Sequence, residues 1–286
     1  MMADRPGSRV RTRTRVVDGP SEQLRTDQVA TEEPLEIRLA AGRDRKTVAV
    51  TMRTPGSDFE LAAGFLFSEA IISSPAHVRA IRYCTDPDVD AEQQYNIVTV
   101  DLAAPALPDL RGLERHFYTS SACGVCGKAA LDALEIRGCP VIGGGFQTAS
   151  DMLYALPEKL RAAQGVFEST GGLHAAGLFD ERGDLVSARE DVGRHNAVDK
   201  LVGWALLSGR LPLSRNIVVV SGRASYEIMQ KCVVAGVPVV CAVSAPSSLA
   251  VSVAERFGVT LVGFLRGRRF NVYSGFDRVV IPELTP

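Results

Sequence analysis

The chain has 286 residues, of which 46% are hydrophobic and 23% are charged, and its formal net charge at pH 7 is −1. This composition is typical of a soluble globular protein with a sizeable core. Because the net charge is close to zero and no apolar run approaches the roughly 18 residues of a membrane span, we expect neither a nucleic-acid partner nor a membrane partner.

The N-terminal part predicts a basic tail followed by a small β-rich unit. Residues 1–27 are rich in arginine and contain no apolar stretch of the kind found in a secretion signal, so we interpret them as a disordered tail. Residues 34–40 and 46–52 alternate apolar and polar side chains around a turn, which predicts a hairpin. Ser57 and Glu60 are spaced as a capping box for a helix over 57–72. Two further strands are expected at 78–83 and 95–102, and a long connection at 103–122.

The C-terminal part has a different pattern. After helices near 129–134 and 153–164 and a hairpin over 173–190, continuously apolar strands alternate with helices from 195 to 267. Such strands are buried on both faces, as in a sheet that is covered by helices. We therefore predict an α/β fold with a three-layer core over 123–286, preceded by an α+β subdomain with its connecting loop over 28–122.

One cysteine pair has the spacing of a chemical site. Without a secretion signal we expect a reducing cytoplasm, where a Cys-x-x-Cys pair is more often catalytic or metal-binding than structural. Cys123 and Cys126 precede a predicted helix whose start, together with Lys128, would lower a thiol pKa. The remaining four cysteines are Cys84, Cys139, Cys232 and Cys241. The last two lie in apolar runs that are typical of a core.

Four roles compete for this pair: half of a zinc site, a dithiol–disulfide couple, a sulfur-carrying nucleophile, or two buried thiols. A structural zinc site needs four ligands, and no second Cys-x-x-Cys or paired histidine motif is present, so we expect no metal. The long connection before Cys123 is unlike the setting of a thioredoxin motif. Disulfide formation between Cys123 and Cys126 stays open.

Three consecutive strand ends in the C-terminal half carry polar groups. Residues 221–225 and 244–248 are small and rich in hydroxyls, and Arg266, Arg268 and Arg269 surround Gly267 after the next strand. Ligands of open α/β sheets bind at such carboxyl ends, and guanidinium groups bind phosphates. The pattern predicts a pocket for an anionic, nucleotide-like ligand.

A dense polar run at 189–200 allows two interpretations. Asp191 suits a helix cap with surface ion pairs around it; alternatively, Arg194, His195 and Asn196 line the same ligand pocket. We interpret His174, a lone histidine, as structural.

Several of these segments together resemble a known family. SACGVCG, GGLHAAGLF, REDVGRHNAVDKL, SGRASYEIMQK, SAPSSLAV and FLRGRRFNVYSG are similar to the formate dehydrogenase accessory sulfurtransferase family, FdhD/NarQ, and the resemblance extends over roughly residues 28–280. It implies a cytoplasmic homodimer with a cytidine-deaminase-like core that lacks zinc.

The resemblance also implies an activity: a sulfurtransferase that carries sulfur from a cysteine desulfurase, through a cysteine persulfide, to the molybdenum cofactor in its bis(molybdopterin guanine dinucleotide) form, for activation of formate dehydrogenase. Cys123 matches the persulfide-bearing cysteine and Cys126 its partner. The family's cofactor-binding segment corresponds to Phe264, Leu265, Arg266, Gly267, Arg268 and Arg269. The alternatives are a cofactor chaperone without persulfide chemistry and a thiol-disulfide oxidoreductase.

Overall fold

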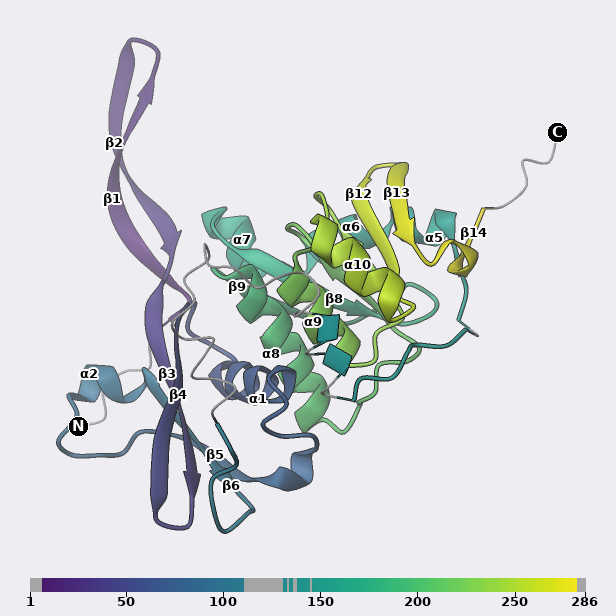
Figure 1. Cartoon of the computed structure of the whole chain (residues 1–286). Helices are drawn as coiled ribbons and strands as arrows, with labels where there is room; N and C mark the ends of the chain where they lie inside the picture. Colours follow the sequence, from purple (N-terminus) through teal and green to yellow (C-terminus); the bar gives the residue numbers. More distant parts are fainter. Residues whose placement is uncertain (1–6, 111–130, 133, 136–137, 145, 282–286) are drawn as a thin grey trace.

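A long two-stranded ribbon projects from the N-terminal side of the protein (Figure 1). The computed structural model describes residues 7–110, 131–132, 134–135, 138–144 and 146–281. Strands β1 (Arg9–Asp18) and β2 (Ser21–Ala30) pair antiparallel along their whole length. They are joined at Gly19, whose φ of 55° suits a tight turn. The prediction of a disordered tail was therefore wrong for residues 9–27.

A four-stranded sheet follows, with strand order β4-β3-β6-β5. The predicted hairpin is confirmed as β3 (Glu33–Ala41) and β4 (Asp44–Arg53), and the two predicted strands as β5 (Val78–Tyr83) and β6 (Ile97–Leu102). Two short helical turns lie in the connections, η1 (Pro75–His77) and α2 (Ala91–Gln94).

Helix α1 (Asp58–Ser68) lies where a helix was expected, but its capping box was wrong. Ser57 has a left-handed φ of 55° and its side chain makes no cap hydrogen bond. Glu60 instead accepts two hydrogen bonds from Arg189, at 2.5 and 2.8 Å. Helix α1 packs closely on α8 (Arg194–Leu207): a Cβ built on Gly203 would lie 1.8 Å from the Glu60 carbonyl oxygen.

The largest sheet has six strands in the order β13-β12-β11-β10-β8-β9. Strands β10 (Ile217–Val220), β11 (Val239–Ala242) and β12 (Thr260–Arg266) are parallel neighbours. The antiparallel members are β8 (His174–Phe179), β9 (Leu185–Asp191) and β13 (Arg269–Ser274).

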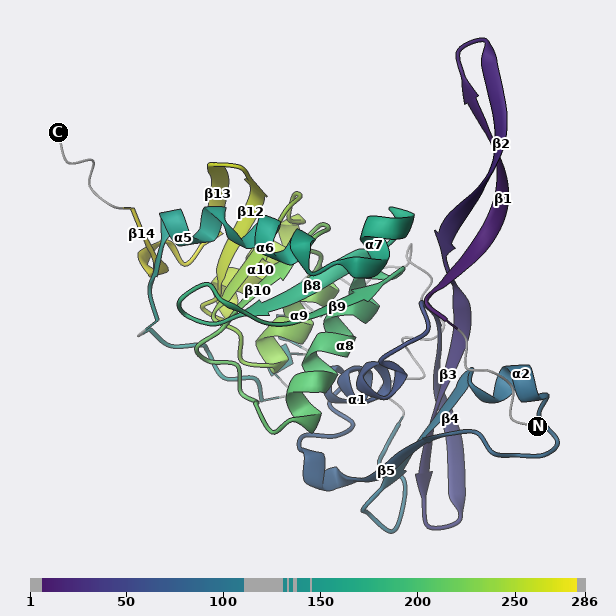
Figure 2. The ribbon, with the colours of Figure 1, turned by 180° about the vertical axis from the view of Figure 1, so that it is seen from behind.

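Helices cover both faces of this sheet (Figures 1 and 2). On one face α8, α9 (Tyr226–Val234) and α10 (Ser248–Arg256) share a hydrophobic core with the four-stranded sheet and α1. On the other face α5 (Ser150–Tyr154) and α6 (Leu156–Ala162) form a second, smaller core. The α/β class and the layered arrangement are thus confirmed, while likeness to cytidine deaminases stays a prediction.

The remaining elements are short: α7 (Gly165–Thr170), the paired strands β7 (Thr148–Ala149) and β14 (Val279–Val280), and the turn η2 (Phe276–Arg278). The larger core joins residues on both sides of the predicted boundary at 122/123, so the N-terminal unit shares its interior with the rest of the chain. Within the described residues, no helix combines the length and apolar character needed to cross a bilayer.

Candidate functional site

The polar strand ends meet at the carboxyl edge of the six-stranded sheet, as predicted. The backbone N–H of Ser244 donates to Gly222 at 3.3 Å, and that of Ser247 donates to Ala224 at 2.9 Å. The N–H of Phe264 in turn donates to the Ser244 carbonyl at 3.1 Å. Segments 221–225, 244–248 and 264–269 therefore form one continuous rim.

One cavity of about 470 Å³ lies at this rim and is called the arginine pocket, defined by Phe264, Arg266, Arg269 and Asn271. Phe264 has a left-handed φ of 55° beside an irregularity in the β12–β13 ladder, and its side chain is 40% exposed. Strain of this kind in a non-glycine residue often marks a binding site. Arg266 Nε donates to the Val243 carbonyl at 3.1 Å, which leaves its terminal nitrogens available to a ligand.

The other residues of the predicted segment point elsewhere. Arg268 lies 3.6 Å from the Asp151 carboxylate, with its guanidinium 5.6 Å from the centre of the Tyr154 ring. Leu265 is fully buried in the smaller core, and Gly267 forms the turn between β12 and β13. The structure brings Arg266 and Arg269 into one pocket and Arg268 does not line it, so a ligand contact by Arg268 stays a prediction.

A second polar group lies along the same edge, where the starts of β8 and α8 meet the 221–225 segment. A Cβ on Gly222 would lie 3.3 Å from His174 Nδ1 and 3.8 Å from Arg194 Cδ. Burial, followed by the nearby positive charge of Arg194, lowers the pKa of His174. His174 is therefore neutral near pH 7 and can donate one hydrogen bond and accept another.

His195 binds the start of α9. Its Nε2 lies 3.1 Å from Ser225 Oγ and 2.9 Å from a carboxylate oxygen of Glu227, to which Ser225 Oγ also donates at 3.1 Å. These contacts lower the pKa of Glu227 to about 2, and the hydrogen bond to His195 is the largest cause of that shift. His195 thus ties α8 to the 221–225 segment.

Of the two interpretations of the 189–200 run, the contacts of Asn196 support the structural one and not the ligand contact. Its side-chain nitrogen donates to the Met52 carbonyl at 2.7 Å and to Asp191 at 3.0 Å. Asp191 also accepts from the Gly193 N–H at 2.8 Å and forms a buried ion pair with Lys200 at 2.7 Å. The cap interpretation was wrong for Asp191, because Gly193 is the N-cap of α8 and no side chain caps this helix; the ion pair of Asp191 is also buried, not on the surface.

Four of the six cysteines lie in the described part of the chain, and two of these, Cys84 and Cys139, are partly exposed. Cys123 and Cys126 lie outside the described residues. Cys232 and Cys241 are fully buried, as predicted for core thiols, and burial raises the pKa of each to about 12. In the described part of the chain, no three His, Cys, Asp or Glu side chains gather as a metal site.

Comparison with known proteins decides the family. The FdhD/NarQ family model matches residues 30–280. The chain belongs to the FdhD/NarQ family. It is 54% identical over 270 residues to the "Sulfur carrier protein FdhD" of Streptomyces avermitilis, covering 93% of this chain and 94% of that protein. It is 46% identical over 260 residues to the protein of the same name from Sulfurisphaera tokodaii, covering 91% and 94%.

A solved structure supports the same family assignment. A crystal structure described as that of a candidate formate dehydrogenase accessory protein from Desulfotalea psychrophila has a TM-score of 0.72 and 26% identity, covering 95% of this chain and 99% of that one. The FdhD/NarQ match begins at residue 30, where β2 ends. It contains the whole carboxyl edge but leaves out nearly all of the N-terminal ribbon.

Proposed function

We propose that this FdhD/NarQ protein is a sulfurtransferase that acts in formate dehydrogenase maturation. It takes sulfur from a cysteine desulfurase onto Cys123 and delivers it to the molybdenum of bis(molybdopterin guanine dinucleotide), its substrate. The observation that carries the proposal is the arginine pocket at the sheet edge, in a chain about half identical to proteins named sulfur carriers.

Loading is a thiol exchange. The Cys123 thiolate attacks the outer sulfur of the desulfurase persulfide; that sulfur–sulfur bond breaks, the desulfurase cysteine leaves as a thiolate, and Cys123 carries the persulfide. Delivery as sulfide needs two electrons, which Cys126 can supply. Attack by its thiolate on the inner sulfur of the Cys123 persulfide releases hydrosulfide and forms a Cys123–Cys126 disulfide, which a cellular dithiol then reduces.

The arginine pocket supplies the anchor for the substrate's phosphates. Arg266 and Arg269 are neighbours across the β12–β13 ladder and both are exposed, so their guanidinium groups can each donate to a diphosphate. Phe264, exposed in the same pocket, offers a face against which a planar ring can stack. Holding the substrate at a fixed place relative to Cys123 lowers the entropic cost of the transfer.

The test is intact mass spectrometry of the full chain after incubation with a cysteine desulfurase and cysteine. We expect a gain of one sulfur atom that Cys123→Ala abolishes and Cys126→Ala retains. If Cys123→Ala still supports formate dehydrogenase activation in cells that lack the native protein, the chaperone alternative is correct. Dithiol turnover that needs no desulfurase would favour the oxidoreductase. A homodimer and a cytoplasmic location stay predictions.

A further inference from the structure

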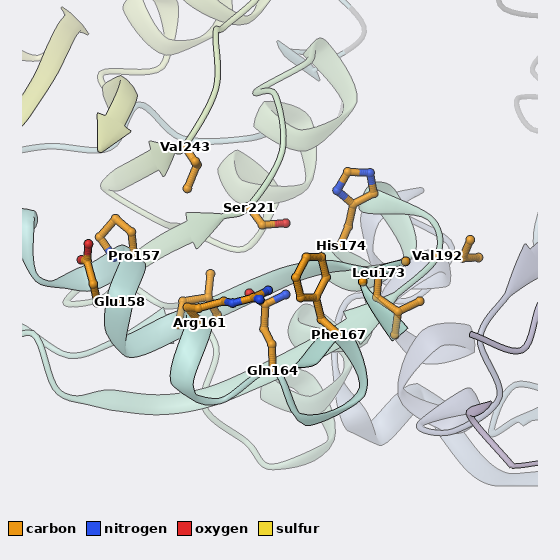
Figure 3. A pocket seen from close by; sticks show the side chains of 13 residues that line it. Pro157, Glu158, Arg161, Gln164, Phe167, Leu173, His174, Val192, Ser221 and Val243 are labelled. Carbon is orange, nitrogen blue, oxygen red and sulfur yellow. The ribbon is translucent and has the colours of Figure 1, made fainter. Parts of the chain in front are cut away.

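A second cavity is lined in part by Val243, whose carbonyl accepts a hydrogen bond from Arg266 of the arginine pocket. It has a volume of about 580 Å³ and is called the α6–α7 pocket, after the two helices that form its floor. Figure 3 shows Glu158 toward one end of the pocket and His174, with Val192 beyond it, toward the other; Gln164, Phe167 and Ser221 lie between Glu158 and His174. Cavities of this size commonly hold small-molecule ligands.

Phe167 is placed in a way that core packing does not explain. Its ring is half-buried, yet it belongs to neither of the two hydrophobic cores of the described chain. The Glu190 carboxylate accepts hydrogen bonds from the N–H groups of Val166 and Phe167, at 3.1 and 2.8 Å, and so fixes the backbone that carries the ring. The Arg161 guanidinium lies 3.9 Å from the ring centre. This pair is a cation–aromatic platform on the pocket wall.

Gln164 is the second unexplained group. The residue is only 5% exposed and lines the pocket, and its side-chain amide makes no hydrogen bond to any other residue in the part of the chain that the structure describes. The Gln164 side-chain atoms are not among the buried polar atoms that lack a partner in the described chain, so the amide opens into the cavity, where a ligand can reach it. The amide has both donors and an acceptor, so it suits the mixed polar edge of a heteroaromatic base.

Further polar groups complete the lining. Ser221 Oγ accepts a hydrogen bond from the Ala175 N–H at 2.9 Å, which leaves its own proton free to donate to a ligand. The neutral His174 ring lies toward the end of the pocket that Val192 also lines. At the other end, the Glu158 carboxylate can accept from sugar hydroxyls, while Arg161 can bind a phosphate.

We propose that the α6–α7 pocket binds a nucleotide, with the base against Phe167 and hydrogen-bonded to Gln164, and the phosphate on Arg161. This goes beyond the proposed sulfur transfer, since it adds a site distinct from the arginine pocket. The two cavities are separated by Val243, whose side chain lines the α6–α7 pocket while its carbonyl accepts from Arg266 of the other. Together with the arginine pocket, this gives two nucleotide sites within the residues that the structure describes.

The test is calorimetry on the full chain with GMP, AMP and inorganic phosphate as probes. An Arg266→Ala/Arg269→Ala background removes the arginine pocket from the measurement. In that background we expect one nucleotide to bind per chain, and phosphate alone to bind far more weakly. Because stacking on an aromatic ring contributes about 1–3 kcal/mol per base, Phe167→Ala should weaken binding by about 5- to 150-fold.

Two further variants make the outcome decisive. Gln164→Leu keeps the side-chain volume and removes the amide, so it should weaken nucleotide binding without lowering the thermal midpoint. Phe264→Ala, the matched aromatic control in the arginine pocket, should leave this binding event unchanged. Absence of nucleotide binding in the arginine-free background, or unchanged affinity in both Phe167→Ala and Gln164→Leu, overturns the proposal. Sulfur loading on Cys123 is a separate readout, so failure of either proposal leaves the other intact.

Discussion

Removing the two arginines of the arginine pocket should cut phosphate binding, whereas removing their neighbour should not. The change is Arg266→Ala with Arg269→Ala, and the matched control is Arg268→Ala, one residue away on the same hairpin. Arg268 has the same charge and is exposed, but it lies against Asp151 and Tyr154 on the other side of the hairpin.

The magnitude follows from the exposure of the two side chains. A hydrogen bond to a charged group contributes about 1.5–3 kcal/mol. Since Arg266 and Arg269 are both solvent-exposed, we take the lower figure for each. Together they amount to about 3 kcal/mol, which corresponds to a loss of affinity on the order of 100-fold.

The assay is titration calorimetry with inorganic pyrophosphate. This probe has the charge of a diphosphate and no ring that the α6–α7 pocket could stack. Affinity of the unaltered protein should fall as salt is raised, because the contacts are ionic and exposed. If the double variant binds pyrophosphate as tightly as the unaltered chain, or if Arg268→Ala loses as much affinity, the assignment of the pocket is wrong.

Three other predictions concern stability and reactivity. Gly203→Ala should destabilise the protein by about 3 kcal/mol, because its Cβ would lie 1.8 Å from the α1 backbone. Gly165→Ala, the control, has open space around it and should leave the stability unchanged. Equal thermal midpoints for the two variants would contradict the close contact between α1 and α8. Glu227→Gln should lower the free energy of unfolding by less than about 1 kcal/mol above pH 4.5, since the carboxylate is 57% exposed. Because the folded pKa of Glu227 is depressed to about 2, that difference should vanish between pH 4.5 and 2; in pH-dependent unfolding, a constant difference would refute the ion pair. Cys232 and Cys241, with pKa values raised to about 12 by burial, should resist iodoacetamide at pH 8, and their alkylation in the folded protein would contradict that burial.

The N-terminal ribbon shows how charge can conceal a strand. Residues 9–16 alternate arginine with threonine or valine, and the two-residue loop between the paired Asp18 and Ser21 begins with Gly19, a common turn residue. The pattern was there, but neither face of the ribbon packs on a core: Val10, Val17 and Leu24 are more than half exposed. Without an apolar face, the run of arginines resembled a solvated tail.

The carboxyl edge was predictable because its information is local. Each buried strand and the polar residues after it lie within about ten residues of one another, so the order of strand ends could be inferred. The directions of the arginines could not. They depend on where the β12–β13 turn falls, since a shift of one residue moves a side chain to the other face. Arg268 lies in the turn with Gly267, whereas Arg266 and Arg269 pair with each other across the ladder.

The α6–α7 pocket lay beyond sequence reasoning for a related reason. Its lining residues come from 157 to 243, out of helices, strand starts and strand ends that only the folded sheet brings together. Gln164 and Phe167 fit the helical pattern of their own segment and carry no motif. His174 was interpreted as structural because its partners, Arg194 and Gly222, are distant in the sequence.

The polar run at 189–200 explains how these parts are held in place. Arg189 binds Glu60 and so ties β9 to α1. The next residue, Glu190, accepts from the N–H of Phe167 and so ties the same strand to the floor of the α6–α7 pocket. Adjacent residues of a strand point to opposite faces of the sheet, and these two anchor one element on each face.

The following residues extend this linkage to the rim. Asp191 is fully buried, paired with Lys200, and accepts from the Thr54 N–H at 3.1 Å, which joins α8 to the chain leaving β4. His195 then contacts Ser225 at the start of α9. The choice between a structural cap and a ligand-binding run was therefore too narrow. Side chains that contact no ligand set the positions of the elements that line both pockets, so a substitution such as Glu190→Gln would act on the α6–α7 pocket through the placement of Phe167.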